Sequence, residues 1–393
     1  MNYKIPFSGK AHNYTDEEID VVIKTMRNSS TFTQGENLKL FEKNFCNFIG
    51  TNHSFALSSA ASGLEIAAQL CQFQPGDEII IPAHTYTASA YPFIKHGAKI
   101  VWADIDLETR VINPSTLINC ISPKTKAIVV VHLYGYGADM PEIMKIAKKN
   151  NLIVIEDVAQ ALGVVIDKKK AGSYGDFGIF SFHSHKNITT LGEGGMITTN
   201  NEKYAKIIPQ LRHNGHCEFN FQRDCYWKPA MGNVDIPDLN GKLLWPNNYC
   251  LGEIQCALGS KLLNRIDSIN IDKAKRAHHF IDSLSNNYNM IFHKVDYPRH
   301  NYHLLVARLI DMDRDLFISR MASLGIQCVV QYYPLYRYDL YKKVGKNSGD
   351  CPNTDIFFDS MVSFPFQQTL KINDLDWMID MTKKCIKEIN AKK

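Results

Sequence analysis

The chain reads SFHSHKNITTLGEGG from Ser181 to Gly195, and this stretch holds one lysine, Lys186. The apolar run Phe177–Phe182 predicts a buried strand that leads into the stretch, and Met196–Thr199 predicts a second strand after it. A lysine on a loop that leaves a buried strand is well placed to act on a ligand, because partial burial lowers the pKa of an amine and makes it a nucleophile for Schiff-base formation. A lone loop lysine is more often a solvated surface charge. Other parts of the sequence are therefore needed to distinguish a catalytic lysine from an ordinary surface lysine.

Composition favours a large folded protein with two parts. The chain has 393 residues, of which 45% are hydrophobic, and this is enough for a large core and for two domains. The net charge of +4 is not concentrated in one region, so nucleic-acid binding is not expected. We interpret the short charged run Asp167–Lys170 as a solvated hairpin turn.

Features that report on location indicate the cytoplasm. The ten cysteines are scattered without a Cys-x-x-Cys pair, which is typical of free thiols in a reducing compartment. The segment Met1–Pro6 lacks the apolar core of a signal peptide, and no apolar run approaches the length needed to cross a bilayer. We therefore expect a soluble cytoplasmic protein without a membrane partner.

Predicted strands alternate with predicted helices over the first half of the chain. The strands are Ser54–Leu57, Glu78–Ile81, Lys99–Ala103, Ala127–Leu133, Leu152–Ile155, Phe177–Phe182 and Met196–Thr199. This alternation predicts right-handed βαβ units and an α/β fold with a large, mostly parallel sheet.

A second, smaller α/β domain is predicted at the C-terminal end. Its pattern starts with a long helix predicted over Tyr249–Ile266, and strands are predicted over Tyr302–Leu309 and Gln327–Gln331. We place the large domain at residues 1–255, including an N-terminal helical segment, and the small domain at residues 256–393.

Polar motifs follow four of the predicted strands. They are Ser59–Ser62, Thr85–Tyr86, Asp157–Gln160 and Ser181–Lys186. Ligands of parallel α/β sheets bind beyond the carboxyl ends of the strands, so these motifs are predicted to meet at one edge. The first motif consists of small residues that open a helix, where backbone N–H groups and the helix dipole favour a phosphate.

Together these side chains match the needs of pyridoxal 5′-phosphate (PLP). Lys186 would hold the cofactor as an imine. Asp157 would pair with the pyridinium nitrogen and keep it protonated, so that the ring acts as an electron sink. Tyr86 would cover one face of the ring, and Gln160 would form a hydrogen bond with the ring hydroxyl.

The cofactor phosphate is predicted to bind at the start of the helix after the first strand. The N–H groups near Ala61 and Ser62, with the hydroxyl of Ser181, would hold it. We also place His183 among the cofactor contacts, because it belongs to the same stretch. His183 and His185 could instead form a metal pair, but no third ligand is near in sequence, and no metal site is predicted.

The order of these motifs resembles that of the DegT/DnrJ/EryC1/StrS family of sugar aminotransferases, within the aspartate aminotransferase fold type (PLP fold type I). The likeness covers nearly the whole chain. It rests on Gly76–Pro82, His84–Tyr86, Asp104–Asp106, His132–Gly135, Glu156–Gln160, Gly172–Asp176, Ser181–Gly195, Tyr333–Pro334 and Ser363–Pro365.

The resemblance implies a PLP-dependent transaminase of amino-sugar or surface-polysaccharide biosynthesis. Its expected amino donor is L-glutamate, or glutamine, and its expected acceptor is a keto sugar attached to a nucleotide. It also implies a homodimer with active sites at the subunit interface, in which Asn248 reaches across to the cofactor phosphate of the partner subunit.

Three departures from the family pattern concern the cofactor phosphate and the acceptor pocket. The chain has Ser59-Ala60-Ala61-Ser62 where the family usually has Ser-Gly-Thr-Ala, and Cys250 where it usually has arginine. The segment Cys217–Trp245 is longer than usual and is a candidate lid, with Arg212, His213 and His216 near its base as possible anion contacts or as ordinary surface residues. A small phosphorylated ketone such as dihydroxyacetone phosphate is therefore the alternative acceptor.

Two other classes of function compete with transamination. A sugar dehydratase of the same family is expected to carry a histidine at the lysine position, and Lys186 argues against it. A non-enzymatic regulator built on this fold would normally carry an added DNA-binding domain, and none is visible in the sequence.

Overall fold

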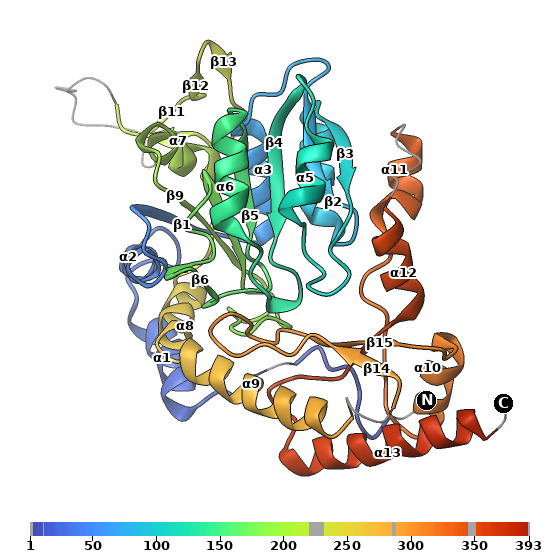
Figure 1. Ribbon diagram of the computed structural model, residues 1–393. Helices are drawn as coiled ribbons and strands as arrows, with labels where there is room; N and C mark the ends of the chain where they lie inside the picture. Colours follow the sequence, from blue (N-terminus) through green and yellow to red (C-terminus); the bar gives the residue numbers. More distant parts are fainter. Residues whose placement is uncertain (1–2, 11, 220–231, 285–287, 345–350, 392–393) are drawn as a thin grey trace.

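The computed structural model describes residues 3–10, 12–219, 232–284, 288–344 and 351–391. Within them, a seven-stranded sheet forms the centre of the molecule (Figure 1). Its strands, in spatial order, are β1 (His53–Leu57), β9 (Gly195–Thr199), β8 (Phe177–Ser181), β5 (Ile153–Asp157), β4 (Thr125–Val131), β2 (Glu78–Pro82) and β3 (Lys99–Ala103). The predicted strands are thus confirmed, with ends that differ by at most two residues.

The direction of the strands brings their carboxyl ends to one edge. Strands β3, β2, β4, β5 and β8 are parallel, and β9 is antiparallel to both β8 and β1. Because β9 opposes two neighbours, β1 runs in the same direction as β8. At this edge, Asp157 of β5 pairs with Val131 of β4 on one side and with Ile179 of β8 on the other. Gly195, at the start of β9, pairs with both Leu57 and Ser181.

Helices cover both faces of the sheet. Helices α5 (Pro114–Cys120) and α6 (Met140–Lys149) lie on one face and α3 (Ala60–Leu70) lies on the other (Figure 1). The strands between them are rich in β-branched residues and buried, as expected for a sheet covered on both sides. Asp139 caps α6, and a proline follows in its first turn.

The N-terminal helices pack outside the sheet. They are α1 (Asp16–Asn28) and α2 (Glu36–Ile49), and both lie against α8 (Glu253–Leu263). The side chain of Thr15 accepts a hydrogen bond from the N–H of Glu18 and that of Glu18 accepts one from the N–H of Thr15, which closes a capping box at the start of α1. Phe41 and Phe45 of α2 are fully buried against Phe180 and Phe182 beside the lysine loop.

A second hydrophobic core lies in the lower part of Figure 1. It is built around the antiparallel strands β14 (Met290–Phe292), β15 (Leu305–Leu309) and β16 (Met361–Phe364) and helices α9 (Ile266–Asp282), α10 (Arg314–Ser323) and α13 (Ile372–Asn390). Ile5, from the start of the chain, is 1% exposed in this core. The division at residue 256 falls within α8 and stays a prediction.

The remaining elements connect or extend these two cores. They are α4 (Tyr91–Lys95), α7 (Glu202–Arg212), α11 (Asp339–Lys343), α12 (Pro352–Ser360), the hairpin strands β6 (Val165–Ile166), β7 (Lys169–Lys170), β10 (His216–Cys217), β11 (Asn233–Val234), β12 (Asp238–Leu239) and β13 (Lys242–Leu243), and the 3-10 turns η1 (Thr87–Ser89), η2 (Leu133–Gly135) and η3 (Leu335–Arg337). The pairing of β6 with β7 confirms the hairpin predicted at Asp167–Lys170. Of the expected lid, Cys217–Trp245, residues 220–231 lie outside the described residues.

Two predictions about the second half of the chain were wrong. The helix expected over Tyr249–Ile266 spans only Glu253–Leu263. Tyr249 is outside the helix, because its N–H donates to Arg212 O and its carbonyl accepts from the N–H of Ser58. The strand expected over Gln327–Gln331 is not a regular strand, since its backbone forms only isolated bridges next to Ile5 and Ser363.

Other expectations concern membrane spans, metal sites and disulfide bonds. In the part of the chain that the structure describes, no helix combines the length and apolar character that a bilayer crossing requires. The same residues contain no group of three or more histidine, cysteine or acidic side chains able to hold a metal ion. The cysteines among them form no disulfide bond with one another.

Candidate active site

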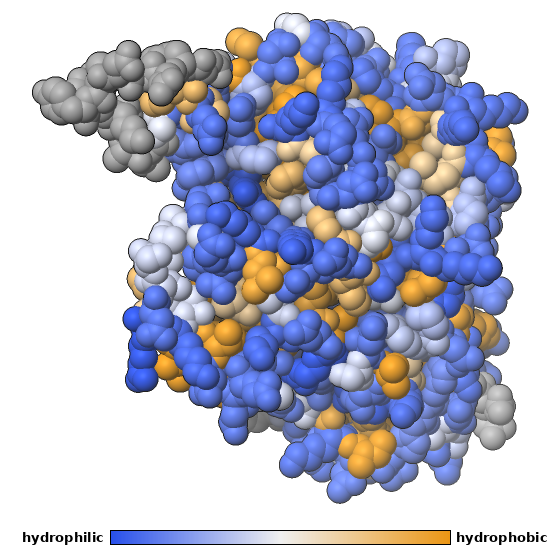
Figure 2. All heavy atoms as spheres, turned by 90° about the vertical axis from the view of Figure 1, so that its left-hand side faces the viewer, coloured by the Kyte–Doolittle hydropathy of each residue, from blue (hydrophilic) through white to orange (hydrophobic). Residues whose placement is uncertain are grey.

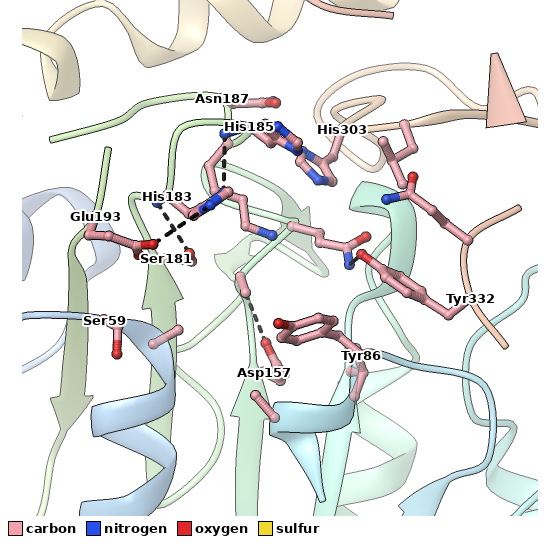
Figure 3. Close-up of a pocket in the computed structure, with 18 of the residues that line it drawn as sticks. Ser59, Tyr86, Asp157, Ser181, His183, His185, Asn187, Glu193, His303 and Tyr332 are labelled. Carbon is pink, nitrogen blue, oxygen red and sulfur yellow. Dashed lines mark hydrogen bonds and ion pairs between the residues drawn. The ribbon is translucent and has the colours of Figure 1, made fainter. Parts of the chain in front are cut away.

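The four polar motifs meet at one cavity, as predicted. This cavity has a volume of about 580 Å3 and lies at the carboxyl edge of the sheet. Residues of all four motifs line it: Ser59, Ala60, Ala61, Thr85, Tyr86, Asp157, Ala159, Gln160, Ser181, His183, His185 and Lys186. Figure 3 shows Ser59 and Asp157 on one side of this pocket and Asn187 and His303 on the opposite side.

Lys186 is held by a tight turn that follows β8. Its N–H donates to His183 O at 2.8 Å, and its own carbonyl oxygen lies 2.7 Å from Nε2 of His12. Burial lowers the pKa of Lys186 from 10.5 to about 8, against the attraction of the Asp157 carboxylate, which raises it. No described side chain forms a hydrogen bond or an ion pair with its Nζ, so the amine is available to a ligand in the cavity.

Asp157 ends β5 with its carboxylate fixed from two sides. Its Oδ2 accepts a hydrogen bond from the Ser89 hydroxyl at 2.7 Å, and its Oδ1 accepts one from the N–H of Ala159 at 3.0 Å. A carboxylate has about four acceptor positions, so Asp157 keeps capacity for one more donor. The residue is 6% exposed, and its carboxylate therefore faces the cavity in a nearly dry setting.

Aromatic and amide groups form the wall next to Asp157. Tyr86 lies with its ring centroid 5.9 Å from that of Tyr332 and is 55% exposed. The Oε1 of Gln160 accepts from the N–H of Tyr134 at 2.8 Å, and its Nε2 donates to the hydroxyl of Tyr332 at 3.1 Å. These bonds fix Gln160, and Figure 3 shows Tyr86 and Tyr332 on the same side of the pocket.

The turn before α3 presents backbone N–H groups at one end of the cavity. Ser59 caps the helix, and its hydroxyl accepts from the N–H of Ser62 at 3.1 Å. Ser62 itself does not line the cavity, because its hydroxyl lies between those of Ser58 and Ser59 at 3.0 and 2.9 Å. A Cβ on Gly195 would lie 2.4 Å from the carbonyl carbon of Ser59, so this glycine lets the turn approach the sheet closely.

The histidines of the lysine loop contact each other and an acidic side chain. The ring of His183 lies 5.1 Å from that of His185, and its Nε2 lies 3.7 Å from Glu193 Oε1. Ser181 contributes its hydroxyl, which accepts from the N–H of His183 at 3.3 Å. Among the described residues, this pair belongs to no group of three or more side chains able to hold a metal ion.

Asn248 and the basic residues near it lie outside the cavity of their own chain. The Asn248 side chain is exposed, and its Oδ1 accepts from the N–H of Cys250 at 3.4 Å. Arg212 forms an ion pair with Glu42 and donates to Ala56 O at 2.9 Å, so its guanidinium has an internal role. The ring of His213 lies 4.5 Å from that of His216.

Several cavity residues were not expected from the sequence. They are Phe7, Ser8 and His12 from the N-terminal segment, and Asn187, Lys273, His303, Gln331, Tyr332 and Phe366 among others. The burial of Lys273 could have been predicted from the sequence. This lysine shares a helical face with the buried residues Ile266, Ile269, Ala277 and Phe280. A lysine on an apolar stripe is unusual, and this spacing marks it as buried.

The donor set fits PLP. The cavity combines an amine without a counter-ion at Lys186, a carboxylate with spare acceptor capacity at Asp157 and an aromatic ring at Tyr86. The N-terminus of α3, an 11-residue helix, meets the same cavity through Ser59, and no acidic side chain lies in its first turn.

Known proteins resemble this chain in sequence and structure over most of its length. The spore coat polysaccharide biosynthesis protein SpsC of Bacillus subtilis is 30% identical over 98% of this chain and 97% of that protein. The GDP-perosamine synthase of Caulobacter vibrioides is 34% identical over 81% of this chain and 82% of that protein. A Streptococcus pneumoniae protein described as a sugar aminotransferase, Spr1654 in its PMP-form, superposes with a TM-score of 0.86 at 26% identity, over 99% of this chain and 100% of that one.

The sequence model of one family matches almost the full length of the chain, from residue 13 to residue 382. Membership of this family implies dependence on PLP. The chain therefore belongs to the DegT/DnrJ/EryC1/StrS aminotransferase family and is a transaminase with the α/β architecture of PLP fold type I.

Proposed function

We propose that this enzyme transfers an amino group from L-glutamate or L-glutamine to the keto group of a nucleotide-linked sugar, in amino-sugar or surface-polysaccharide biosynthesis. The names of two relatives, a spore coat polysaccharide biosynthesis protein and a GDP-perosamine synthase, support this substrate class. One observation carries the proposal: the Lys186 amine, with its pKa lowered to about 8, shares a cavity with the carboxylate of Asp157 and the ring of Tyr86.

Lys186 is proposed to hold PLP covalently and to move a proton during transfer. When PLP is bound, it withdraws electrons from the carbon that carries the amino group. The Nζ of Lys186, once released, would take a proton from that carbon and deliver it later in the transfer. A pKa of about 8 suits both directions, because the amine gives and takes protons readily near neutral pH.

The other cavity residues are proposed to orient the cofactor. Asp157 would accept a hydrogen bond from the ring nitrogen, and Tyr86 would lie against the ring and exclude water. Gln160 would bind the ring hydroxyl. Its side chain is already fixed by two hydrogen bonds, so little conformational entropy would be lost on binding.

The phosphate is proposed to bind at the start of α3, near Ala61, with the hydroxyl of Ser181 and with His183 nearby. Ser59 lines the cavity at this point. Ser62 does not line it, but its hydroxyl contacts the hydroxyls of Ser58 and Ser59, which do. The missing family threonine is thus compensated in this proposal by the hydrogen-bonded serines rather than by Ser62 directly.

The active unit is proposed to be a homodimer, with Asn248 of one chain near the cofactor phosphate of the other. Asn248 is exposed and does not line the cavity of its own chain, which supports a role across an interface. The neighbouring segment exposes large apolar side chains, with Val234 58%, Leu243 56% and Trp245 67% exposed. Figure 2 presents this side of the molecule, where apolar side chains interrupt the polar surface.

The proposal can be tested with purified protein loaded with PLP. The protein is mixed with L-glutamate or L-glutamine and with a panel of keto-sugar nucleotides and small keto phosphates, and the products are identified by mass spectrometry. Amination of a keto-sugar nucleotide is the expected result. Amination only of a small keto phosphate such as dihydroxyacetone phosphate would replace the proposed acceptor, and sugar deoxygenation without amino transfer would indicate a dehydratase.

A further inference from the structure

Lys273 is a second lysine on the wall of the cavity. It lies on α9 and is 4% exposed. Its Nζ lies 3.2 Å from the carbonyl oxygen of His303 and 3.3 Å from Oδ1 of Asn187, the residue that follows Lys186. These two contacts fix the ammonium group beside the lysine loop.

The charge of Lys273 has no counter-ion in the described residues. Both of its hydrogen-bond acceptors are neutral oxygens, and the nearest acidic neighbour in sequence, Asp272, forms an ion pair with Arg276 at 2.9 Å. Burial and the nearby charge of Arg276 together lower the pKa of Lys273 from 10.5 to about 7, against the attraction of Asp272, which raises it. A buried ammonium without an anion is costly, so an anion that enters the cavity gains a strong interaction there.

The position of Lys273 separates it from the proposed cofactor phosphate. Its two acceptors belong to Asn187 and His303, and Figure 3 shows both across the pocket from Ser59 and Asp157. The phosphate is proposed to bind on the Ser59 side, at the start of α3. The anion that meets Lys273 must therefore come from a substrate.

Chemistry favours the amino donor as the source of this anion. The carboxylate of an amino acid is bonded directly to the carbon that carries the amine, so it must lie close to Lys186 during transfer. The phosphates of a nucleotide-linked sugar are separated from a ring ketone by several bonds and lie further from the reacting carbon. Lys273, which contacts the residue after Lys186, is at the closer position.

We propose that Lys273, held between Asn187 and His303, binds the carboxylate of the amino donor. This inference rests on the proposed function, because it assigns one substrate of the same site. The two-acceptor arrangement leaves the ammonium with one further N–H for the carboxylate. The ring of Phe366, 5.3 Å from Nζ, shields the contact from water and strengthens it.

The test measures binding of glutarate, a dicarboxylate without an amine, to the PLP-loaded enzyme by calorimetry. Lys273→Met removes the charge and Lys273→Arg keeps it. Lys275→Met is the matched control, because Lys275 is exposed on the same helix. We expect glutarate to bind about ten- to a hundred-fold more weakly to Lys273→Met, with a smaller loss in Lys273→Arg and no change in Lys275→Met. The rate at which L-glutamate reacts with the bound cofactor should fall most in Lys273→Met, less in Lys273→Arg and not at all in Lys275→Met.

Parallel measurements separate the possible outcomes. UDP and GDP are titrated into the same variants, and cofactor attachment to Lys186 is trapped with borohydride to show that the site is intact. Unchanged glutarate affinity in Lys273→Met, or weaker UDP or GDP binding with glutarate unaffected, would overturn the inference. A wild-type enzyme that attaches PLP but never reacts with glutamate or glutamine would instead overturn the proposed function.

Discussion

The Nε2 of His12 lies 2.7 Å from the carbonyl oxygen of Lys186, although 174 residues separate the two in sequence. His12 is 2% exposed, and burial lowers the pKa of its imidazole, so the neutral ring with its proton on Nε2 is favoured and donates to this carbonyl. The same N-terminal segment is anchored at its other end, where Ile5 forms two backbone hydrogen bonds with the segment 325–327. The start of the chain thus connects the second core to the lysine loop.

The contact predicts that His12→Ala weakens the fold around Lys186. The substitution leaves a buried carbonyl oxygen without its donor, which costs about 1–3 kcal/mol. Urea denaturation of the protein without cofactor should detect this loss. His12→Gln can present an amide N–H to the same carbonyl and should recover part of the stability. Equal stability of His12→Ala and the wild type would show that the contact contributes nothing.

Lys186→Ala is expected to abolish covalent attachment of PLP and to reduce turnover by at least about a thousand-fold, because it removes both the attachment point and the proton carrier. Borohydride reduction followed by peptide mass spectrometry reports the attachment site. Lys273→Met serves as the control, since Lys273 is the other lysine on the cavity wall and should leave attachment intact. Cofactor found on Lys273 would refute the assignment of Lys186.

Local patterns were sufficient to predict the strands that build the site. Each strand of the large sheet is a short apolar run, and motifs such as Asp157–Gln160 follow directly in sequence, so the parallel arrangement alone brings them to one edge. The strand predicted at Gln327–Gln331 was wrong because its pairing depends on distant segments. Its backbone partners are Ile5 and Ser363, and no local pattern encodes pairing with such distant segments.

The far wall of the cavity depends on packing between distant segments. His12, Lys273 and His303 reach it from three parts of the chain, and each is a polar residue whose burial follows only from the way these parts meet. Lys273 could be found from its place on the apolar face of α9. The burial of His303 could not be predicted in this way, because a single histidine within a predicted strand has many possible surroundings.

Asp157→Asn should bind PLP but lose activity. An amide cannot supply the negative charge that stabilises a protonated ring nitrogen, and loss of one charge-assisted hydrogen bond of about 1.5–3 kcal/mol predicts a rate roughly ten- to a hundred-fold lower. Single-turnover rates with L-glutamate measure this effect. Glu193→Gln changes another carboxylate on the cavity wall and should have a smaller effect. Similar rates for both variants would contradict the proposed pairing of Asp157 with the ring nitrogen of PLP.

Gly195→Ala should disturb the proposed phosphate end of the cavity. The added Cβ would lie 2.4 Å from Ser59 C and 2.6 Å from Ala60 N, and these are backbone atoms that cannot rotate away. Overpacking of this kind costs about 1–3 kcal/mol, and PLP affinity should fall because the turn must move. Gly63→Ala, within α3, is the control, because the Cβ there meets only side-chain atoms at 3.2–3.3 Å. Equal PLP affinity in the two variants would contradict the prediction.

The pH dependence of PLP capture follows from the environment of Lys186. Burial lowers the pKa of its amine from 10.5 to about 8, so the unprotonated, nucleophilic form should accumulate as the pH rises through 8. The rate of attachment to the protein without cofactor should increase with pH, with a midpoint near 8, and then level off. Stopped-flow absorbance between pH 6 and pH 10 (a range chosen to bracket the pKa of about 8) measures it.

The lowered pKa of Lys186 also predicts how the stability of the fold changes with pH. Below pH 8 the lysine is protonated in both the folded and the unfolded chain, so the cost of burying the charge is fully present. Between pH 8 and 10.5 the unfolded chain binds more protons at this position than the folded one, so the contribution of this group to stability rises with pH. Lys186→Met, which carries no charge, should therefore be more stable than the wild type at pH 7, and the difference should narrow through this window. A constant difference, together with a capture midpoint near 10.5, would mean that Lys186 is solvated like an ordinary surface lysine.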